Sequence, residues 1–314
     1  MKIYLDCWPC FLRQALSAAR RAGASPVLQR AILEETMTEL HALSDEATPP
    51  EMGNQIHRLV RERTQVADPY RASKQEATAR ALALLPTLRE RVAAADDPLA
   101  TAVRIAIAGN IIDYGVAESY DLEATLERVL RATAAIDDME VLRQALQQVD
   151  AVLYLADNAG ETVFDRVLIE TLPVPVHYVV KAGPVLNDAT REEAIEAGLD
   201  QVAELSETGC DAMGTPLGLC SPGFRERFER AGLIIAKGQA NYETLSDVEA
   251  PIVFLLQAKC SVIAEDIGVD TGGVIIKASA DRICLSARRA GDRALPQRLV
   301  GAIRLSNVRK VYTD

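Results

Sequence analysis

The chain has 314 residues, 49% hydrophobic and 25% charged, a composition typical of a folded protein rather than a disordered one. Its formal net charge of -11 argues against nucleic acid and anionic lipid as partners, because both repel an acidic surface. The sequence shows no signal-peptide core, no apolar run long enough for a bilayer and only six dispersed cysteines, so we predict a cytoplasmic protein with reduced thiols.

Up to about residue 148 the patterns are almost entirely helical. Apolar residues recur at helical spacing in five stretches, and a Pro-rich segment at residues 44–53 interrupts the pattern after the second. Pro9 and Gly23 stand near the ends of the first stretch, where such residues commonly begin and end helices. The predicted helices cover residues 9–23, 26–43, 74–95, 100–116 and 122–136.

From residue 150 onward, short runs rich in Val, Ile and Leu alternate with helical stretches. The predicted strands cover residues 151–156, 175–180, 231–237, 251–257 and 272–279. Continuous apolar strands separated by helices predict a mostly parallel sheet covered on both faces, which is a doubly wound α/β fold. We therefore predict an N-terminal all-helical domain at residues 1–97 and an α/β domain at 98–314. The helices of residues 98–148 could pack on either part.

Polar side chains follow three of the predicted strands, and the carboxyl ends of parallel strands meet at one rim of a sheet. Helix capping explains each position taken singly, because Asp and Asn accept hydrogen bonds from free backbone N–H groups. Their convergence favours a binding site instead. The residues concerned are Asp157, Asn158 and Glu161 after the first strand, Lys181, Asn187 and Asp188 after the second, and Lys237, Gly238 and Asn241 after the third.

Oxygen donors without His or Cys suit a hard divalent cation such as Mg²⁺ or Mn²⁺. Lys237 would add a positive charge for phosphate, and Gly238 would let the backbone approach closely. A cation, a lysine and helix amino termini together predict a site for a phosphate ester.

Seven segments resemble the motifs of the damage-control phosphatase family, which is also catalogued as domain of unknown function 89. They are "CWPCFLRQAL", "DPYRASKQEA", "GNIIDYGV", "DNAGE", "GPVLNDAT", "KGQANYETL" and "LLQAKC", and the early CxxC is similar to that of the bacterial and archaeal branch. The resemblance spans nearly the whole chain. It implies a Rossmann-like three-layer α/β/α body and hydrolysis of small phosphate monoesters, such as sugar phosphates, phosphopantetheine-like compounds or damaged phosphometabolites.

The resemblance also implies roles for particular residues. Asp157, Asn158 and Asp188 would hold the metal, which could be Mn²⁺, Mg²⁺, Co²⁺ or Ni²⁺. Asp157, Asp188 and Lys237 are the predicted catalytic residues, and Asp157 is either a ligand alone or also the nucleophile. The predicted substrate-binding residues are Asn110, Asp113, Glu161, Asn187, Gly238, Asn241 and Lys259.

Two other functions stay open at this point: an S-adenosylmethionine-dependent carboxyl methyltransferase and a non-catalytic ligand-binding protein. A dinucleotide enzyme is disfavoured, because "DNAGET" rather than GxGxxG follows the first strand. Cys7 and Cys10 form a CxxC that is more typical of thiols packed in the interior than of a redox or metal-binding motif, because it lies at the start of a helical region. The Gly- and Pro-rich stretch at residues 206–224 is either a lid or a plain connection.

Overall fold

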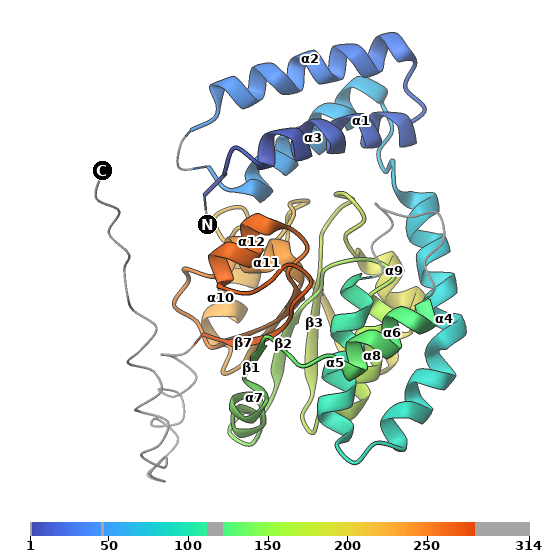
Figure 1. The fold of residues 1–314 in the computed structure, drawn as a ribbon, viewed down its shortest axis with the longest axis vertical. Helices are drawn as coiled ribbons and strands as arrows, with labels where there is room; N and C mark the ends of the chain where they lie inside the picture. Colours follow the sequence, from blue (N-terminus) through green and yellow to red (C-terminus); the bar gives the residue numbers. More distant parts are fainter. Residues whose placement is uncertain (1, 45–46, 112–121, 280–314) are drawn as a thin grey trace.

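The computed structural model describes residues 2–44, 47–111 and 122–279. Its first three helices are α1 (Cys7–Arg21), α2 (Pro26–Ala42) and α3 (Pro49–Thr64). They pack around a hydrophobic cluster of their own, which extends from Phe11 to Tyr70. We call these helices the helical unit, and Figure 1 shows them as a separate tier above the rest of the chain.

The remaining elements build an α/β body. In chain order they are α4 (Arg71–Ala93), α5 (Pro98–Ile111), α6 (Leu122–Arg131), β1 (Ile136–Asp137), α7 (Met139–Leu146), β2 (Val152–Leu155), α8 (Thr162–Thr171), β3 (Val176–Val180), α9 (Arg191–Glu196), the 3-10 turn η1 (Leu199–Gln201), β4 (Glu204–Glu207), α10 (Pro222–Arg230), β5 (Ile234–Lys237), α11 (Gly238–Leu245), β6 (Ile252–Gln257), α12 (Ser261–Ile267) and β7 (Val274–Ala278).

Within the described residues the sheet has seven strands in the order β1-β7-β6-β5-β2-β3-β4. Neighbouring strands are parallel except for β7, which runs antiparallel to β6. From β2 the chain moves one way to β3 and β4, and β5 then continues on the opposite side of β2. The strand order therefore reverses at β2 and β5, and ligands of open α/β sheets bind at such a point.

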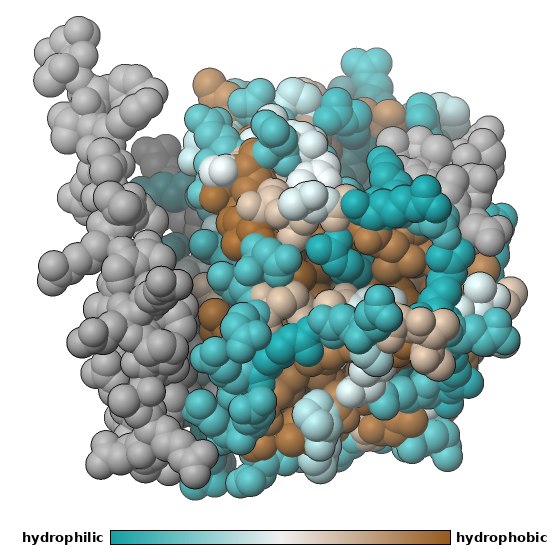
Figure 2. Space-filling model, turned by 60° about the horizontal axis from the view of Figure 1, so that its bottom comes forward, coloured by the Kyte–Doolittle hydropathy of each residue, from teal (hydrophilic) through white to brown (hydrophobic). Residues whose placement is uncertain are grey.

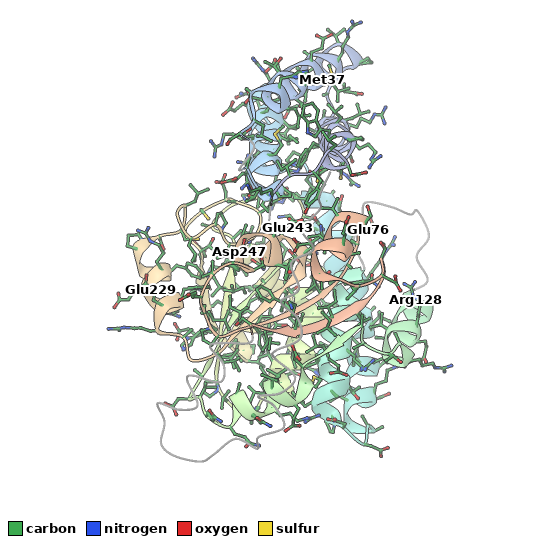
Figure 3. The ribbon with its side chains drawn as sticks, turned by 60° about the vertical axis from the view of Figure 1, so that its left-hand side comes forward. Met37, Glu76, Arg128, Glu229, Glu243 and Asp247 are labelled. Atoms are coloured by element: carbon green, nitrogen blue, oxygen red, sulfur yellow. The ribbon has the colours of Figure 1, made fainter. Side chains whose placement is uncertain are left out.

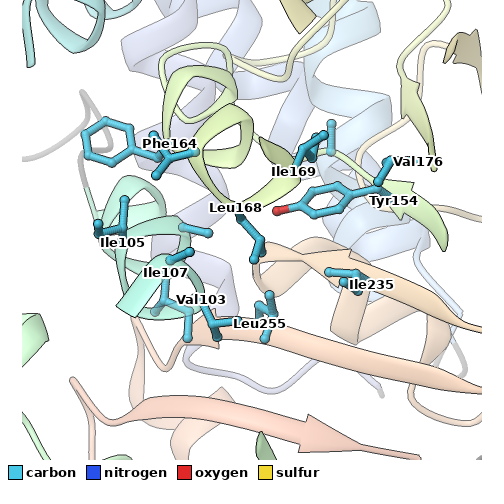
Figure 4. Packing of buried hydrophobic residues seen from close by; sticks show 14 of the residues in the cluster. Val103, Ile105, Ile107, Tyr154, Phe164, Leu168, Ile169, Val176, Ile235 and Leu255 are labelled. Carbon is cyan, nitrogen blue, oxygen red and sulfur yellow. The ribbon is translucent and has the colours of Figure 1, made fainter. Parts of the chain in front are cut away.

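Side-chain alternation along the strands divides the core into two layers. Tyr154, Tyr178 and Ile235 face a cluster shared with α4, α5 and α8. Their strand neighbours, such as Leu153 and Ile234, face a second cluster that includes residues of α10, α11 and α12. Figure 4 shows the first layer, where α5 and α8 pack against the sheet. Burial on both faces explains the continuous apolar runs and confirms the predicted three-layer α/β fold.

Helices α3 and α7 and strands β1 and β4 were not predicted, and the helix predicted over residues 122–136 ends at Arg131, so that Ile136 lies in β1 instead. Helix α3 begins inside the Pro-rich segment, because Pro at the first turn and a capping box formed by Thr48 and Glu51 start a helix rather than interrupt one. Strand β4, with the sequence "ELSE", lies at the sheet edge and lacks buried residues, so it has no hydrophobic signal. Strand β1 has only two residues.

Helix α4 packs with the body. Its buried residues from Ala81 to Val92 belong to the cluster shared with α5, α8 and the sheet. The predicted domain boundary at residue 97 follows α4, whereas the hydrophobic clusters separate close to residue 70. The helices of residues 98–146 likewise contribute to the sheet-side cluster.

The helical unit contacts loops at the carboxyl ends of the strands. Arg61 of α3 donates to the carbonyl of Pro184, which follows β3, and Asn54 accepts from the backbone N–H of Met213, which follows β4. Figure 3 shows Glu243 of α11 on the side of the body that faces these helices. Burial raises the pKa of Glu243 to about 7, which fits a junction that excludes water.

Across the described ranges, no helix is long and apolar enough to cross a membrane. Figure 2 shows hydrophilic residues over most of the visible face, with hydrophobic residues mainly in the furrows between them.

Candidate metal centre

The three predicted metal ligands lie together at the point where the strand order reverses. Asp157 and Asn158 follow β2, and Asp188 follows the neighbouring strand β3. Asn158 and Asp188 form an isolated antiparallel bridge, and the N–H of Ala189 donates to the carbonyl oxygen of Asp157 at 2.8 Å. Backbone hydrogen bonds thus hold the loops after β2 and β3, which carry the predicted ligands, side by side.

The side chains of these residues do not cap helices. The carboxylate oxygen Oδ2 of Asp157 accepts from Nδ2 of Asn110 at 2.7 Å and from Nδ2 of Asn158 at 2.9 Å. Helix α8 has Glu161 as its N-cap without a side-chain capping bond, and α9 has Thr190 in a capping box with Glu193. The capping explanation for this cluster is therefore wrong for these two helices.

Gly238 lets the end of β5 approach the carboxylate of Asp157. It has a φ of +78°, and a Cβ added there would lie 1.8 Å from Oδ2 of Asp157. A side chain at position 238 would therefore displace the predicted ligand. This close approach explains why position 238 is occupied by glycine.

Lys237 is fully buried and does not face open space. Its ammonium group donates to Glu161, to Asp165 at 2.7 Å and to the carbonyl of Ala106 at 2.9 Å, which uses all three protons. Although burial opposes it, the charges of Asp165 and Glu161 raise the pKa of Lys237. The arrangement makes Lys237 a counter-charge for two carboxylates rather than the phosphate ligand that we expected.

Two tyrosines complete this buried network. The hydroxyl of Tyr154 donates to Oδ1 of Asp165 at 2.7 Å, and that of Tyr178 donates to Oδ2 at 2.8 Å, while the rings stack 5.3 Å apart. Figure 4 shows the hydroxyl of Tyr154 pointing toward α8. Sequence reasoning missed the tyrosines, although they occupy paired positions on neighbouring strands and Asp165 stands one helical turn after Glu161.

Asp157 lies in a surplus of negative charge. Burial, then the charges of Glu161 and Asp188, raise the pKa of Asp157 well above its usual range, while Lys259 and Lys181 lower it. Lys181 lies 3.7 Å from Asp188 and donates to the carbonyl of Gly214. Lys259 is exposed and follows β6, so it is the lysine of this set that solvent reaches.

The donor set fits a hard divalent cation. Four buried carboxylates face two buried ammonium groups, which formally leaves two negative charges without compensation: Asp157, Glu161, Asp165 and Asp188 against Lys181 and Lys237. Oδ1 of Asn110 is buried and accepts no hydrogen bond among the described residues. No three His, Cys, Asp or Glu side chains group as a metal site in the described ranges, but the predicted set has two carboxylates and one amide.

The remaining predicted residues serve mainly to organise the site. Asn110 at the end of α5 donates to both Asp157 and Glu161. Asn241 donates to the carbonyls of Ala156 and Lys237, so it holds α11 against the end of β2. Asp113 lies outside the described residues.

A small pocket opens beside the predicted ligands, between α4 and the loops after β2 and β3. Its lining includes Asn158 and Asn187, and it also includes Ser73 and Lys74 of α4. Lys74 is buried and pairs with Asp68 and Glu193, each at 2.8 Å. The motif "DPYRASKQEA" contains Asp68 and Lys74, but the sequence alone did not indicate that they pair with Glu193.

The chain thus has an α/β/α body that the helical unit covers. Its acidic site lies where the strand order reverses, which is the usual position of ligand sites in α/β enzymes. Residues 3–275 match the sequence profile of the damage-control phosphatase ARMT1-like domain. The chain therefore belongs to the damage-control phosphatase family, as its motifs predicted, and this membership makes it a phosphatase.

Similar proteins support this assignment. A damage-control phosphatase of Archaeoglobus fulgidus is 36% identical, over 88% of this chain and 99% of its own length. An uncharacterised protein of Methanocaldococcus jannaschii is 37% identical, over 88% of this chain and 95% of its own. The crystal structure of a DUF89 family protein from Pyrococcus horikoshii, 32% identical, superposes with a TM-score of 0.82 over 88% of this chain and 99% of that chain.

Proposed function

We propose that this phosphatase requires a divalent metal and hydrolyses small phosphate monoesters, including damaged phosphometabolites. The observation that carries the proposal is the meeting of Asp157, Asn158 and Asp188 at the strand reversal, inside a cluster with surplus negative charge. The names of the related damage-control phosphatases support the substrate class.

Asp157, Asn158 and Asp188 would hold the metal. Nδ2 of Asn158 is committed to Asp157 and Glu161, so its Oδ1 is the atom that can coordinate. Among the described residues, both side-chain hydrogen bonds to the carboxylate of Asp157 go to Oδ2, which leaves Oδ1 for a cation or for nucleophilic attack on phosphorus. When bound, the metal supplies Lewis-acid stabilisation of phosphate charge.

The protein's own groups have distinct tasks. Asn110 and Asn158 orient the carboxylate of Asp157, and Lys237 holds Glu161 in place. We assign the phosphate oxygens to Lys259 rather than Lys237, because Lys259 is exposed and acts electrostatically on Asp157. Helix α8 directs its amino terminus to this rim, where backbone N–H groups favour anions.

The test is phosphate release from a panel of phosphorylated metabolites with Mn²⁺, Mg²⁺, Co²⁺ or Ni²⁺ and without metal. Asp157→Asn should abolish release and also the rise in melting temperature on adding Mn²⁺, while its metal-free melting temperature should not fall. Asp200→Asn, which changes an exposed carboxylate in η1, is the matched control. Undiminished turnover of Asp157→Asn would refute the proposal, as would equal turnover without metal.

A further inference from the structure

The loop between β4 and α10 carries two cysteines whose sulfur atoms face each other. We call residues 208–221 the strap. Its base is closed by a backbone hydrogen bond of 2.9 Å from Ser221 to Thr208, and Sγ of Cys210 lies 3.9 Å from Sγ of Cys220. Regular elements fix both ends, because β4 ends at Glu207 and Ser221 caps α10.

The residues between the two cysteines connect the helical unit to the rim. Asp211 pairs with Arg61 at 2.5 Å, and Met213 donates its N–H to Asn54 of α3. On the other side, Gly214 accepts from Lys181, and the hydroxyl of Thr215 donates to Asn241 at 2.7 Å. The strap therefore connects the helical unit to the rim of the sheet through an ion pair and hydrogen bonds, and it is not a plain connection.

The two thiols have opposite character. The contact with the sulfur of Cys220 lowers the pKa of Cys210, although burial opposes this shift. The hydrogen bond to Cys210 and burial raise the pKa of Cys220. Cys210 is only partly buried, whereas Cys220 is buried. Because Cys210 is the more accessible of the two, it is the thiol that attacks first, and Cys220 behind it is the resolving thiol.

The CxxC of α1 lacks this arrangement. Cys7 and Cys10 are free thiols, and burial raises the pKa of Cys7. The cysteine pair whose sulfur atoms face each other thus lies in the strap, where the sequence shows no CxxC spacing.

We propose that Cys210 and Cys220 are a reversible redox site, which a low-molecular-weight disulfide oxidises to an intramolecular disulfide that cross-links the strap. This inference does not depend on the proposed function.

The chemistry balances in two exchange steps. The thiolate of Cys210 attacks one sulfur of the small disulfide RSSR, and a mixed disulfide forms as RS⁻ leaves. Cys220 then loses its proton and attacks the sulfur of Cys210, which forms the Cys210–Cys220 bond and expels the second RS⁻. Two electrons pass from the protein to RSSR, and the two thiol protons end on two RSH molecules.

The first experiment exposes the full chain to oxidised glutathione, alkylates the remaining thiols and maps the tryptic peptides. Both cysteines fall in the peptide of residues 192–225, because trypsin cleaves after Arg191 and Arg225. We expect this peptide to be lighter than the dithiol form by two hydrogen atoms and to carry no alkyl group. Two alkyl groups on it, or a persistent glutathione adduct, would overturn the proposal.

Variants separate the two roles. Cys220→Ser should stop at the mixed disulfide on Cys210, whereas the paired variant Cys7→Ser with Cys10→Ser should still form the strap disulfide. Cys220→Ala should slow alkylation of Cys210 at pH 7 about tenfold, because the thiolate loses its hydrogen-bond donor, while Cys220→Ser keeps a donor and should change it little. Equal alkylation rates of Cys210 in the wild type, in Cys220→Ala and in Cys220→Ser would contradict the roles assigned to the two thiols.

A conformational readout tests the cross-link. Hydrogen exchange at the amides of Met213 and Thr215, which are hydrogen-bonded to Asn54 and Thr244, should slow in the oxidised protein. The same two amides in Cys210→Ser, treated identically, provide the baseline. Unchanged exchange in the oxidised wild type would show that the disulfide does not fix the strap.

Discussion

At the scale of the residue, Lys237 shows how a single buried ammonium group serves as counter-charge to two of the buried carboxylates, Glu161 and Asp165. The ammonium group reaches two carboxylates from α8 and one carbonyl from α5. Removing this ammonium group would leave the two buried carboxylates without a positive partner. Lys237 is thus a positioning residue whose loss affects folding and the site together.

Lys237→Met should lower the free energy of unfolding by about 3–5 kcal/mol, because Glu161 and Asp165 would keep buried charges without their partner. Urea denaturation measures this change. Adding Asp165→Asn to the variant should restore part of the loss, since one of the two stranded charges is then removed. A loss below about 1 kcal/mol would contradict the role as counter-charge.

His57 of α3 gives a prediction for pH. Burial, followed by the charge of Arg61, lowers the pKa of His57 to about 4, against about 6.5 in an unfolded chain. Between these values the unfolded chain binds more protons, so this contribution to stability is present above pH 6.5 and is lost as the pH falls toward 4.

Between pH 7 and pH 5, His57 should therefore reduce the free energy of unfolding by about 2 kcal/mol. His57→Gln, which does not titrate, should lose correspondingly less over this interval. Denaturation of both proteins at the two pH values measures the difference, and the other titrating groups are common to both. Parallel pH profiles would show that His57 is not buried as a neutral group.

At the scale of the element, the turn from β5 into α11 brings backbone against the carboxylate of Asp157. Gly238→Ala should abolish Mn²⁺ stabilisation and reduce turnover more than tenfold, because the added Cβ would overlap Oδ2. Gly268→Ala is the matched control: its φ of +82° is similar, yet nothing lies within 4 Å of the added Cβ.

The control should lose only about 1 kcal/mol of stability from backbone strain and keep its turnover. Phosphate release and thermal unfolding with and without Mn²⁺ compare the two variants. Similar behaviour of both variants would mean that strain alone, and not contact with Asp157, explains the glycine at position 238.

Much of the fold could be predicted from elements that are buried on both faces, because their apolar runs are unambiguous. Strand β4 and helix α3 could not, since the first is a half-exposed edge strand and the second begins at prolines. The meeting of Asp157, Asn158 and Asp188 could be predicted, because the strand ends define a rim. The direction of Lys237 could not, since a long side chain can turn inward or outward from the same backbone position.

At the scale of the whole molecule, the triplet of Lys74, Asp68 and Glu193 joins the segment after the helical unit to α9. Lys74→Met should lower the free energy of unfolding by about 3–5 kcal/mol, since it leaves two mostly buried carboxylates unpaired. Arg71→Met removes the neighbouring exposed pair with Glu192 and should cost less than about 1 kcal/mol.

Chemical denaturation of these two variants checks this contrast. Comparable losses in both would show that the Lys74 triplet contributes no more than a surface ion pair. A large loss confined to Lys74→Met would instead show that this triplet stabilises the contact of α4 with α9 and with the segment that follows α3.

The backbone links between the loops after β2 and β3 have a consequence for how the centre can change over time. The bonds from Ala189 to Asp157 and from Ala159 to Asn187 join main-chain atoms only, so they persist whatever side chains project from those positions. Replacing an oxygen donor with imidazole, as in Asp188→His, should alter the preferred ion while the spacing of the scaffold stays the same. Evolution or design could thus change the ion preference of the proposed metal site without rebuilding the surrounding protein.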